Sequence, residues 1–171
     1  MIDPRLTADV KVAEGLKLVA YKDTEGFWTV GYGHELQPTT KDWTGYAITQ
    51  MQAEGLLILD LENAKHDAQK CPEWPVLNDC RQNAVTELVF NLGFDKWMRF
   101  RKCRLALLNQ RWKEAEAELL NSDWRTEVGP TRSERLGRYL RLGSYLRLVA
   151  GSSSSPPSAS DSAPTPSAPT S

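Results

Sequence analysis

Three side chains near the start of the chain have the types and spacing that cleavage of a glycosidic bond requires. They are Glu14, Asp23 and Thr29, with eight residues between the first two and five between the last two. In such a reaction one carboxyl group protonates the leaving oxygen, and a second carboxylate stabilises the oxocarbenium-like centre or activates a water molecule. A hydroxyl group beside the second carboxylate can hold that water. The three residues therefore predict glycoside hydrolysis by general acid catalysis.

Glu14 is expected at the end of a short helix. Asp3 followed by Pro4 is typical of a helix start, with an N-cap and then a proline at the first helical position, and Gly15 ends the pattern. At a helix C-terminus the macrodipole disfavours negative charge. This position therefore favours the protonated form of Glu14, which is the form that a general acid needs.

The two other residues are expected on a hairpin. Strand patterns at 18–21 and 27–30 flank a turn-forming cluster. Pairing of these strands would bring Asp23 toward Thr29 and place both opposite Glu14. The alternatives are ordinary structural roles, in which the aspartate caps the turn and the threonine is a common strand residue.

The remainder of the chain is predicted to be helical. A capping box from Thr49 to Gln52 opens a helix over 49–70. We interpret this helix as the connection between a lobe at 1–48 and a lobe at 71–150. The predicted fold class is α+β, mostly helical, with a small antiparallel sheet in the first lobe.

Apolar residues at helical spacing predict the faces that pack in the second lobe. A Gly-Pro pair at 129–130 should break the chain before a last helix over 132–148. The two predicted stripes are Val85, Leu88, Val89 and Leu92, and then Leu105, Leu108, Trp112, Ala115 and Leu119.

The segment from 14 to 34 resembles the phage-type lysozymes, the T4-like muramidases of glycoside hydrolase family 24. Two further stretches are similar to that family's F-N-x-G turn and R-x-x-R helix start, and the resemblance covers about residues 3–149. The stretches that carry it are AEG at 13–15, YKDT at 21–24, WTVGYGH at 28–34, FNLG at 90–93 and RSER at 132–135.

The resemblance implies roles for individual residues of the first lobe and the connecting helix. Glu14 would be the proton donor, and Asp23 and Thr29 would hold the attacking water. His34 would pair with Asp60 on the connecting helix. The fold implied is two lobes with the substrate in the cleft between them.

On the second lobe the resemblance implies that Arg132 reaches across the cleft to Glu14. Phe90 and Asn91 would line the cleft, with Cys103 as a further substrate contact. Cys103 departs from the family pattern, which places a small polar residue there. Core packing is the alternative for Phe90, and a surface position is the alternative for Arg132.

The 171-residue chain has a net charge of −1, which hides an asymmetry. Residues 1–95 carry 8 Lys and Arg against 15 Asp and Glu, whereas residues 96–149 carry 13 against 6. The basic half predicts an anionic partner, for which an anionic cell envelope and nucleic acid are both candidates. Alternatively, the basic half simply balances the acidic one.

The N-terminus has no apolar segment typical of a signal peptide, and no run reaches transmembrane length. The protein is therefore expected in a host cytoplasm until its release to the cell wall, and the resemblance implies a pore-forming holin or cell rupture for access. The cysteines Cys71, Cys80 and Cys103 are odd in number, so free thiols are expected, with a Cys71–Cys80 bridge left open. Residues 151–171 have the composition of a disordered tail.

These observations predict a muramidase domain at 1–150 that cuts the β-1,4 bond between N-acetylmuramic acid and N-acetylglucosamine of peptidoglycan with inversion. It is expected to act as a monomer, without metal or cofactor, nucleic acid, or stable membrane insertion. Two alternatives remain. A lytic transglycosylase would use Glu14 but needs no water, and a non-catalytic module would use the basic half at 96–149 to bind cell-wall polymer or nucleic acid.

Overall fold

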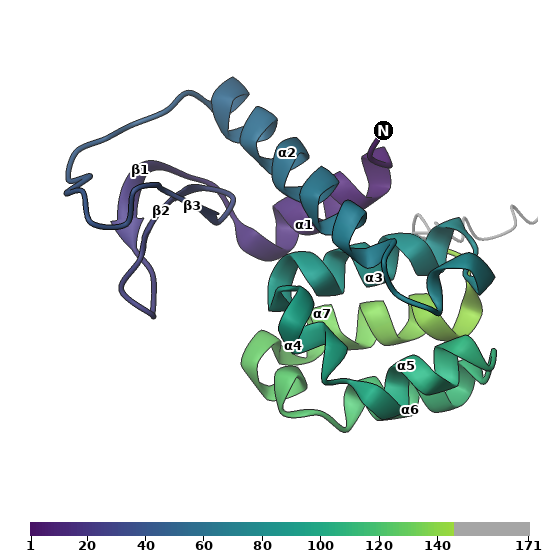
Figure 1. Cartoon of the computed structure of the whole chain (residues 1–171). Helices are drawn as coiled ribbons and strands as arrows, with labels where there is room; N and C mark the ends of the chain where they lie inside the picture. Colours follow the sequence, from purple (N-terminus) through teal and green to yellow (C-terminus); the bar gives the residue numbers. More distant parts are fainter. Residues whose placement is uncertain (146–171) are drawn as a thin grey trace, which may run out of the picture.

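The computed structural model describes residues 1–145, which fold into two lobes joined by a long helix (Figure 1). The predicted tail at 151–171 lies outside the described residues. The described elements are α1 (Pro4–Glu14), β1 (Lys17–Lys22), β2 (Trp28–Gly31), β3 (His34–Glu35), α2 (Gln50–Ala68), a 3-10 helix (Trp74–Val76), α3 (Asp79–Leu92), α4 (Phe94–Met98), α5 (Arg101–Leu108), α6 (Trp112–Leu120) and α7 (Asp123–Leu142).

Helix α1 begins and ends where the sequence predicts. The Asp3 carboxylate accepts the N–H of Arg5 at 2.8 Å, and Pro4 occupies the first turn. Gly15 ends the helix with a φ of 69°, a conformation that favours glycine. Glu14 is therefore the last residue of α1, as predicted.

The predicted hairpin is present, and a short third strand extends it. The strands are antiparallel in the order β1-β2-β3. Tyr21 lies opposite Thr29, and Val30 lies opposite His34. An irregularity in the pairing between Lys17 and Tyr21 shifts the register of β1. This register places Thr29 in the middle strand, so neighbouring strands fix its position on both sides.

Helix α2 belongs to both lobes. The predicted capping box is present, because Thr49 accepts the N–H of Gln52 at 3.2 Å and the Gln52 side chain accepts the N–H of Thr49 at 2.8 Å. Figure 1 shows the helix running from the sheet to the helical lobe. Its first buried residues join the core of the first lobe and its last ones join the core of the second. These residues are Ala53, Leu57 and Leu61, and then Ala64 and Ala68.

The second lobe is a helical bundle, and its details correct one expectation and confirm another. The stripe predicted to run continuously through residues 105–119 is wrong, because a turn around Gln110 separates α5 from α6 and changes the direction of the chain. Leu105 and Leu108 are exposed, whereas Ala106 and Leu107 are buried. The predicted break at 129–130 appears as a kink at Gly129 within α7.

The last described helix is shorter than predicted. It ends at Leu142, and Gly143 follows with the left-handed conformation that commonly terminates helices. The sequence pattern predicted that this helix would continue to residue 148. Residues 146–148 lie outside the described part of the chain. Aromatic residues near this end pack back onto the bundle, with Tyr139 and Tyr145 in edge-to-face contact.

Candidate active site

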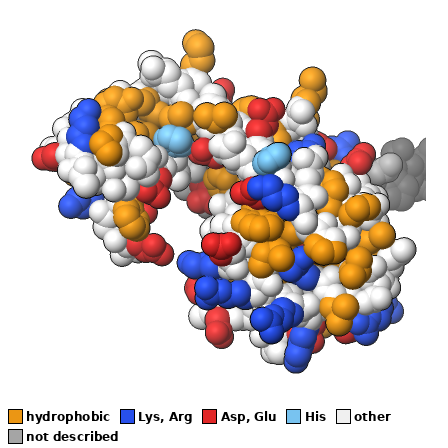
Figure 2. Space-filling model, in the orientation of Figure 1, with side chains coloured by type: hydrophobic (Ala, Val, Ile, Leu, Met, Phe, Trp, Pro, Cys, Tyr) orange, Lys and Arg blue, Asp and Glu red, His pale blue; other side chains and the backbone are white. Residues whose placement is uncertain are grey.

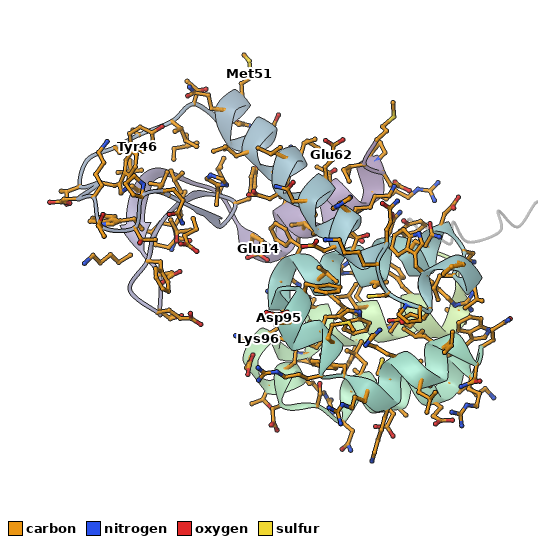
Figure 3. The ribbon with its side chains drawn as sticks, in the orientation of Figure 1. Glu14, Tyr46, Met51, Glu62, Asp95 and Lys96 are labelled. Carbon is orange, nitrogen blue, oxygen red and sulfur yellow. The ribbon has the colours of Figure 1, made fainter. Side chains whose placement is uncertain are left out.

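Glu14 stands at the junction of the two lobes with one carboxylate oxygen fixed (Figure 3). Arg132 of α7 donates from Nη1 to Glu14 Oε1 at 2.6 Å. The other oxygen, Oε2, has no hydrogen-bond partner among residues 1–145 and faces Gly33, where a Cβ would lie 3.8 Å away. The side chain is 22% exposed. One oxygen is therefore held by Arg132, and the other has no hydrogen-bond partner within the described residues.

A cleft of about 410 Å³ opens beside Glu14. Its walls come from the turn between β2 and β3, from β3, from α2 and from the end of α3, with Asp60 and Phe90 among the lining residues. Figure 2 shows an open notch between the two lobes. A site between lobes that draws its walls from both is the usual location for a ligand.

Asp23 and Thr29 lie together on the hairpin, as predicted. Asp23 Oδ1 accepts the N–H groups of Glu25 and Phe27, each at 2.9 Å. Asp23 Oδ2 lies 3.4 Å from the Thr29 hydroxyl, and Thr29 is 4% exposed. Local hydrogen bonds therefore fix both side chains. Neither residue lines the 410 Å³ cleft, so the pair stands on the sheet beside it.

Tyr21 lies near both Asp23 and Glu14, and the sequence analysis gave it no role. Burial raises the pKa of Tyr21 most, and the negative charges of Asp23 and Glu14 raise this pKa further. The phenol therefore lies within electrostatic reach of both carboxylates. Its place in β1 directly opposite Thr29 is the signal that a strand register drawn from the sequence could have used.

His34 and Asp60 form the expected contact between β3 and α2. His34 Nδ1 and Asp60 Oδ2 are 2.9 Å apart, and both side chains are about one-quarter exposed. The hydrogen bond to Asp60 is the largest cause that raises the pKa of His34, and it outweighs the opposing effect of burial. The functional role of this pair remains a prediction.

Arg132 belongs to a larger cluster of charges. It is 8% exposed and donates from Nε to Glu87 Oε1 at 3.0 Å. Arg135 donates to both oxygens of Glu87, at 2.7 and 3.0 Å, and to Asp9 at 2.8 Å. The sequence motif pointed to Arg132, but it gave no role to Glu87 or Asp9. A glutamate between the buried apolar positions of α3 was the available signal.

The remaining predicted substrate contacts have different outcomes. Phe90 lines the cleft and also packs against both hydrophobic cores, so its two proposed roles are compatible. Asn91 lines the cleft, and its side-chain oxygen accepts the indole N–H of Trp124 at 2.7 Å. The placement of Cys103 corrects the expectation that it reaches the cleft. Its thiol is buried and contacts the Ala115 carbonyl at 3.4 Å.

The structure also answers the question left open about the thiols. Cys71, Cys80 and Cys103 are all free and buried, so no Cys71–Cys80 bridge is present. Burial raises the pKa of Cys80 to about 11 and that of Cys103 to about 12. Such thiols stay protonated at neutral pH and are poor nucleophiles. They are therefore packing residues.

Residues 1–145 contain neither a metal-binding cluster nor a membrane-spanning helix. Within this part of the chain, no group of three or more His, Cys, Asp or Glu side chains could hold a metal ion. None of its helices is both long and apolar enough to cross a membrane.

Comparison with known proteins gives consistent matches. The sequence model of the family described as phage lysozyme matches residues 11–137. Probable T4-type lysozyme 1 of Dictyostelium discoideum is 27% identical over 157 residues, which cover 78% of this chain and 92% of that protein. The endolysin of Acyrthosiphon pisum secondary endosymbiont phage 1 is 37% identical over 84 residues, which cover 49% of this chain and 54% of that protein.

A third relative shows this type of sequence within a much larger protein. The pre-baseplate central spike protein Gp5 of Enterobacteria phage T4 is 29% identical over 133 residues. The match covers 65% of this chain but only 23% of that protein.

Proposed function

Because the chain belongs to the phage lysozyme family, we propose that it cleaves the β-1,4 bond between N-acetylmuramic acid and N-acetylglucosamine of peptidoglycan. Membership of this family supports the broader assignment of a hydrolase that acts on peptidoglycan. The observation that carries the more specific proposal is how the two carboxylate oxygens of Glu14 are placed. Arg132 fixes one of its oxygens, and the other is free beside an interlobe cleft.

In the proposed mechanism, Glu14 acts as the general acid. Its Oε2 gives a proton to the glycosidic oxygen as the bond to the anomeric carbon breaks. Asp23 and Thr29 hold a water molecule on the opposite face of the sugar, and Asp23 accepts a proton as that water attacks. The two products together contain the atoms of one added water molecule. Exchange with solvent then returns a proton to Glu14 and removes one from Asp23. Attack from the opposite face inverts the configuration of the anomeric carbon.

The nearby side chains support this division of labour. Asp23 Oδ1 accepts two backbone N–H groups, which hold its carboxylate in place beside the Thr29 hydroxyl. Glu14 is the last residue of α1, and its Oε2 has no hydrogen-bond partner among residues 1–145 and lies beside the cleft. The two acids therefore have different surroundings, which supports different roles for them in the proposed reaction.

We extend the proposal to the biological setting. The relative named endolysin supports a role in lysis of a bacterial host. In that setting the enzyme would act as a monomer, accumulate in the host cytoplasm and reach the wall through a holin. It would have no nucleic-acid partner and would not insert stably into the membrane. The match to a spike protein keeps a virion-associated role as the competing possibility.

The test is to identify the sugar ends formed on purified sacculi in water enriched in ¹⁸O. The proposal predicts new reducing muramic acid ends that carry one ¹⁸O atom, with the α anomer formed first. Reducing glucosamine ends would overturn the assigned bond. Anhydromuramic ends would identify a transglycosylase, and binding without new ends would identify a non-catalytic module.

A further inference from the structure

Glu87 lies at the centre of a buried charge cluster that ends at Glu14. We propose that Glu87 is a positioning residue that acts through Arg132 to keep Glu14 protonated. This inference rests on the proposed role of Glu14 as the general acid. It concerns a residue of α3 that does not line the cleft.

The geometry ties Glu87 to the same guanidinium that contacts Glu14. Arg132 donates from Nη1 to Glu14 and from Nε to Glu87, at 2.6 and 3.0 Å. Its remaining nitrogen, Nη2, is buried and has no hydrogen-bond partner among residues 1–145. Two carboxylates therefore determine where this guanidinium lies. A change in the charge of one carboxylate therefore alters the position of the Arg132 guanidinium and its electrostatic effect on the other carboxylate.

Glu87 is deeply buried and completely engaged. The residue is 1% exposed, and both of its oxygens accept hydrogen bonds from Arg135. A buried carboxylate that is held by two guanidinium groups remains charged, because its ionised form has all the partners that it needs. It therefore places a negative charge on the same Arg132 guanidinium that contacts Glu14.

The charge balance of the cluster depends on whether Glu14 is protonated. The cluster contains two cations, Arg132 and Arg135, and two further anions, Glu87 and Asp9. These four charges cancel, so the cluster is neutral only when Glu14 holds its proton. In a buried environment an uncompensated charge is costly. Without Glu87, the lone contact with Arg132 would favour ionised Glu14 instead.

Other ionisable groups also face Glu14, and the experiment must hold them constant. They come from the hairpin and from the walls of the cleft, and none of them contacts Glu87. They are Tyr21, Asp23, Tyr32, His34, Glu35, Asp60 and Asp67. Because all of them remain in every variant below, comparison with the wild type isolates the effect of the cluster.

The test is the pH dependence of initial rates on sacculi for full-length Glu87→Gln and Arg135→Gln variants. Loss of an anion from the cluster should move the alkaline limb of the profile to lower pH, by about half a pH unit or more. Loss of a cation should move it to higher pH. The double variant loses one charge of each sign, so its alkaline limb should return close to that of the wild type.

A buried pair elsewhere in the molecule provides a matched control. Glu73 is also 1% exposed and is held by Arg104 at 2.7 and 2.9 Å, but it does not touch the cluster. Glu73→Gln should lower the melting temperature as Glu87→Gln does, and it should leave the alkaline limb in place. Damage to the fold alone cannot produce shifts of opposite sign.

The outcomes separate the inference from the proposed function. Equal alkaline limbs in the wild type and both single variants, or shifts in the same direction, would overturn the role of Glu87. Wild-type turnover by Glu14→Gln would instead overturn the general acid itself. If Glu87→Gln does not fold, Asp9→Asn decides, because this less buried anion of the same cluster should also move the limb to lower pH.

Discussion

The hairpin that carries Asp23 and the cluster that contacts Glu14 hold their carboxylates through contacts of different range. Asp23 is bound by N–H groups two and four residues away and by a hydroxyl six residues away. Glu14 is bound by Arg132, 118 residues along the chain. One side of the proposed reaction therefore depends on a turn, whereas the other depends on the assembly of both lobes.

This difference has consequences for stability and for chemistry. The hairpin can keep its geometry as long as the sheet is formed. The cluster needs α1, α3 and α7 in place at once, and its buried charges are costly to expose singly. We therefore expect substitutions in the hairpin to act locally, and substitutions in the cluster to change both the fold and the proton of Glu14.

The largest effect is expected from replacing Glu14, the proposed proton donor, which is held by a contact between distant segments. Glu14→Gln should lower turnover on sacculi by about 10²–10⁴-fold, because an amide cannot donate the required proton. The melting temperature should remain close to that of the wild type, since the amide oxygen can still accept from Arg132. Steady-state rates and thermal unfolding measure the two effects.

Glu54→Gln is the matched control for that variant. Glu54 of α2 pairs with Lys11 of α1 at 2.7 Å, it is partly exposed, and it makes no contact with Arg132, Arg135 or Glu87. This control should retain wild-type turnover. Turnover by Glu14→Gln within threefold of the wild type would remove the residue from its assigned role.

A smaller effect is expected from a substitution in the hairpin, where the contacts are local in the sequence. Thr29→Ala should slow hydrolysis by roughly 10–10²-fold with little change in KM, because it misplaces the water and leaves the sugar contacts intact. Asp23 should remain in position through the N–H groups of Glu25 and Phe27. Thr29→Ser keeps the hydroxyl and should stay within a few-fold of the wild type. Equal losses in the two variants would mean that the buried methyl group matters instead.

The contact between His34 and Asp60 differs from both regions, because it joins β3 to α2 within the first part of the chain. Because the folded pKa of His34 is raised, its stabilising contribution is complete below the unfolded value of about 6.5. The contribution is lost as pH rises through the folded value. Asp60→Asn should therefore lower the free energy of unfolding by roughly 0.5–1.5 kcal/mol at mildly acidic pH, and by less at high pH.

Asp67→Asn provides the reference for this measurement. Asp67 lies on the same helix and pairs with Lys70, whose charge does not change between about pH 5 and 8. Urea unfolding of both variants across this range should give a pH-dependent loss for Asp60→Asn and a flat one for Asp67→Asn. A flat loss for both would mean that His34 does not take part as a charged partner.

The smallest effect is expected for exposed basic residues that take part neither in the hairpin contacts nor in the buried charge cluster. Lys96, Arg99, Arg101 and Lys102 are exposed and form no ion pair within the described part of the chain. Figure 3 labels Lys96 at the edge of the second lobe that faces the notch. Lys96→Gln should weaken binding to anionic cell walls by about two- to threefold at low salt, since screening acts within ~10 Å at 0.1 M.

Lys113→Gln removes an equal charge from α6 and serves as its control. Wall binding by the two variants and the wild type should converge at about 1 M salt, where charges are screened within ~3 Å. If Lys96→Gln and Lys113→Gln behave alike at every salt concentration, the position of the cationic segment is unimportant. The basic half would then only balance the acidic one.

The sequence predicted those parts of the fold that depend on neighbours in the chain. The cap at Asp3, the capping box at Thr49, the end of α1 at Gly15 and the pairing that joins Asp23 to Thr29 all involve residues at most six positions apart. Such contacts are set by local backbone geometry and side-chain hydrogen bonds. They can therefore be inferred without knowing how distant segments pack.

Tertiary structure decided the parts that depend on distant segments. Glu87 meets Arg132 across 45 residues and Asp9 meets Arg135 across 126, and no local pattern encodes such a meeting. Cys103 faces the core because α5 packs against α6, and Leu105 is exposed for the same reason. The sequence by itself pointed to Glu14 and Asp23 as the acids of the proposed reaction. Only the packing of the helices decided which charges surround Glu14, because burial and charge balance are properties of the assembled fold.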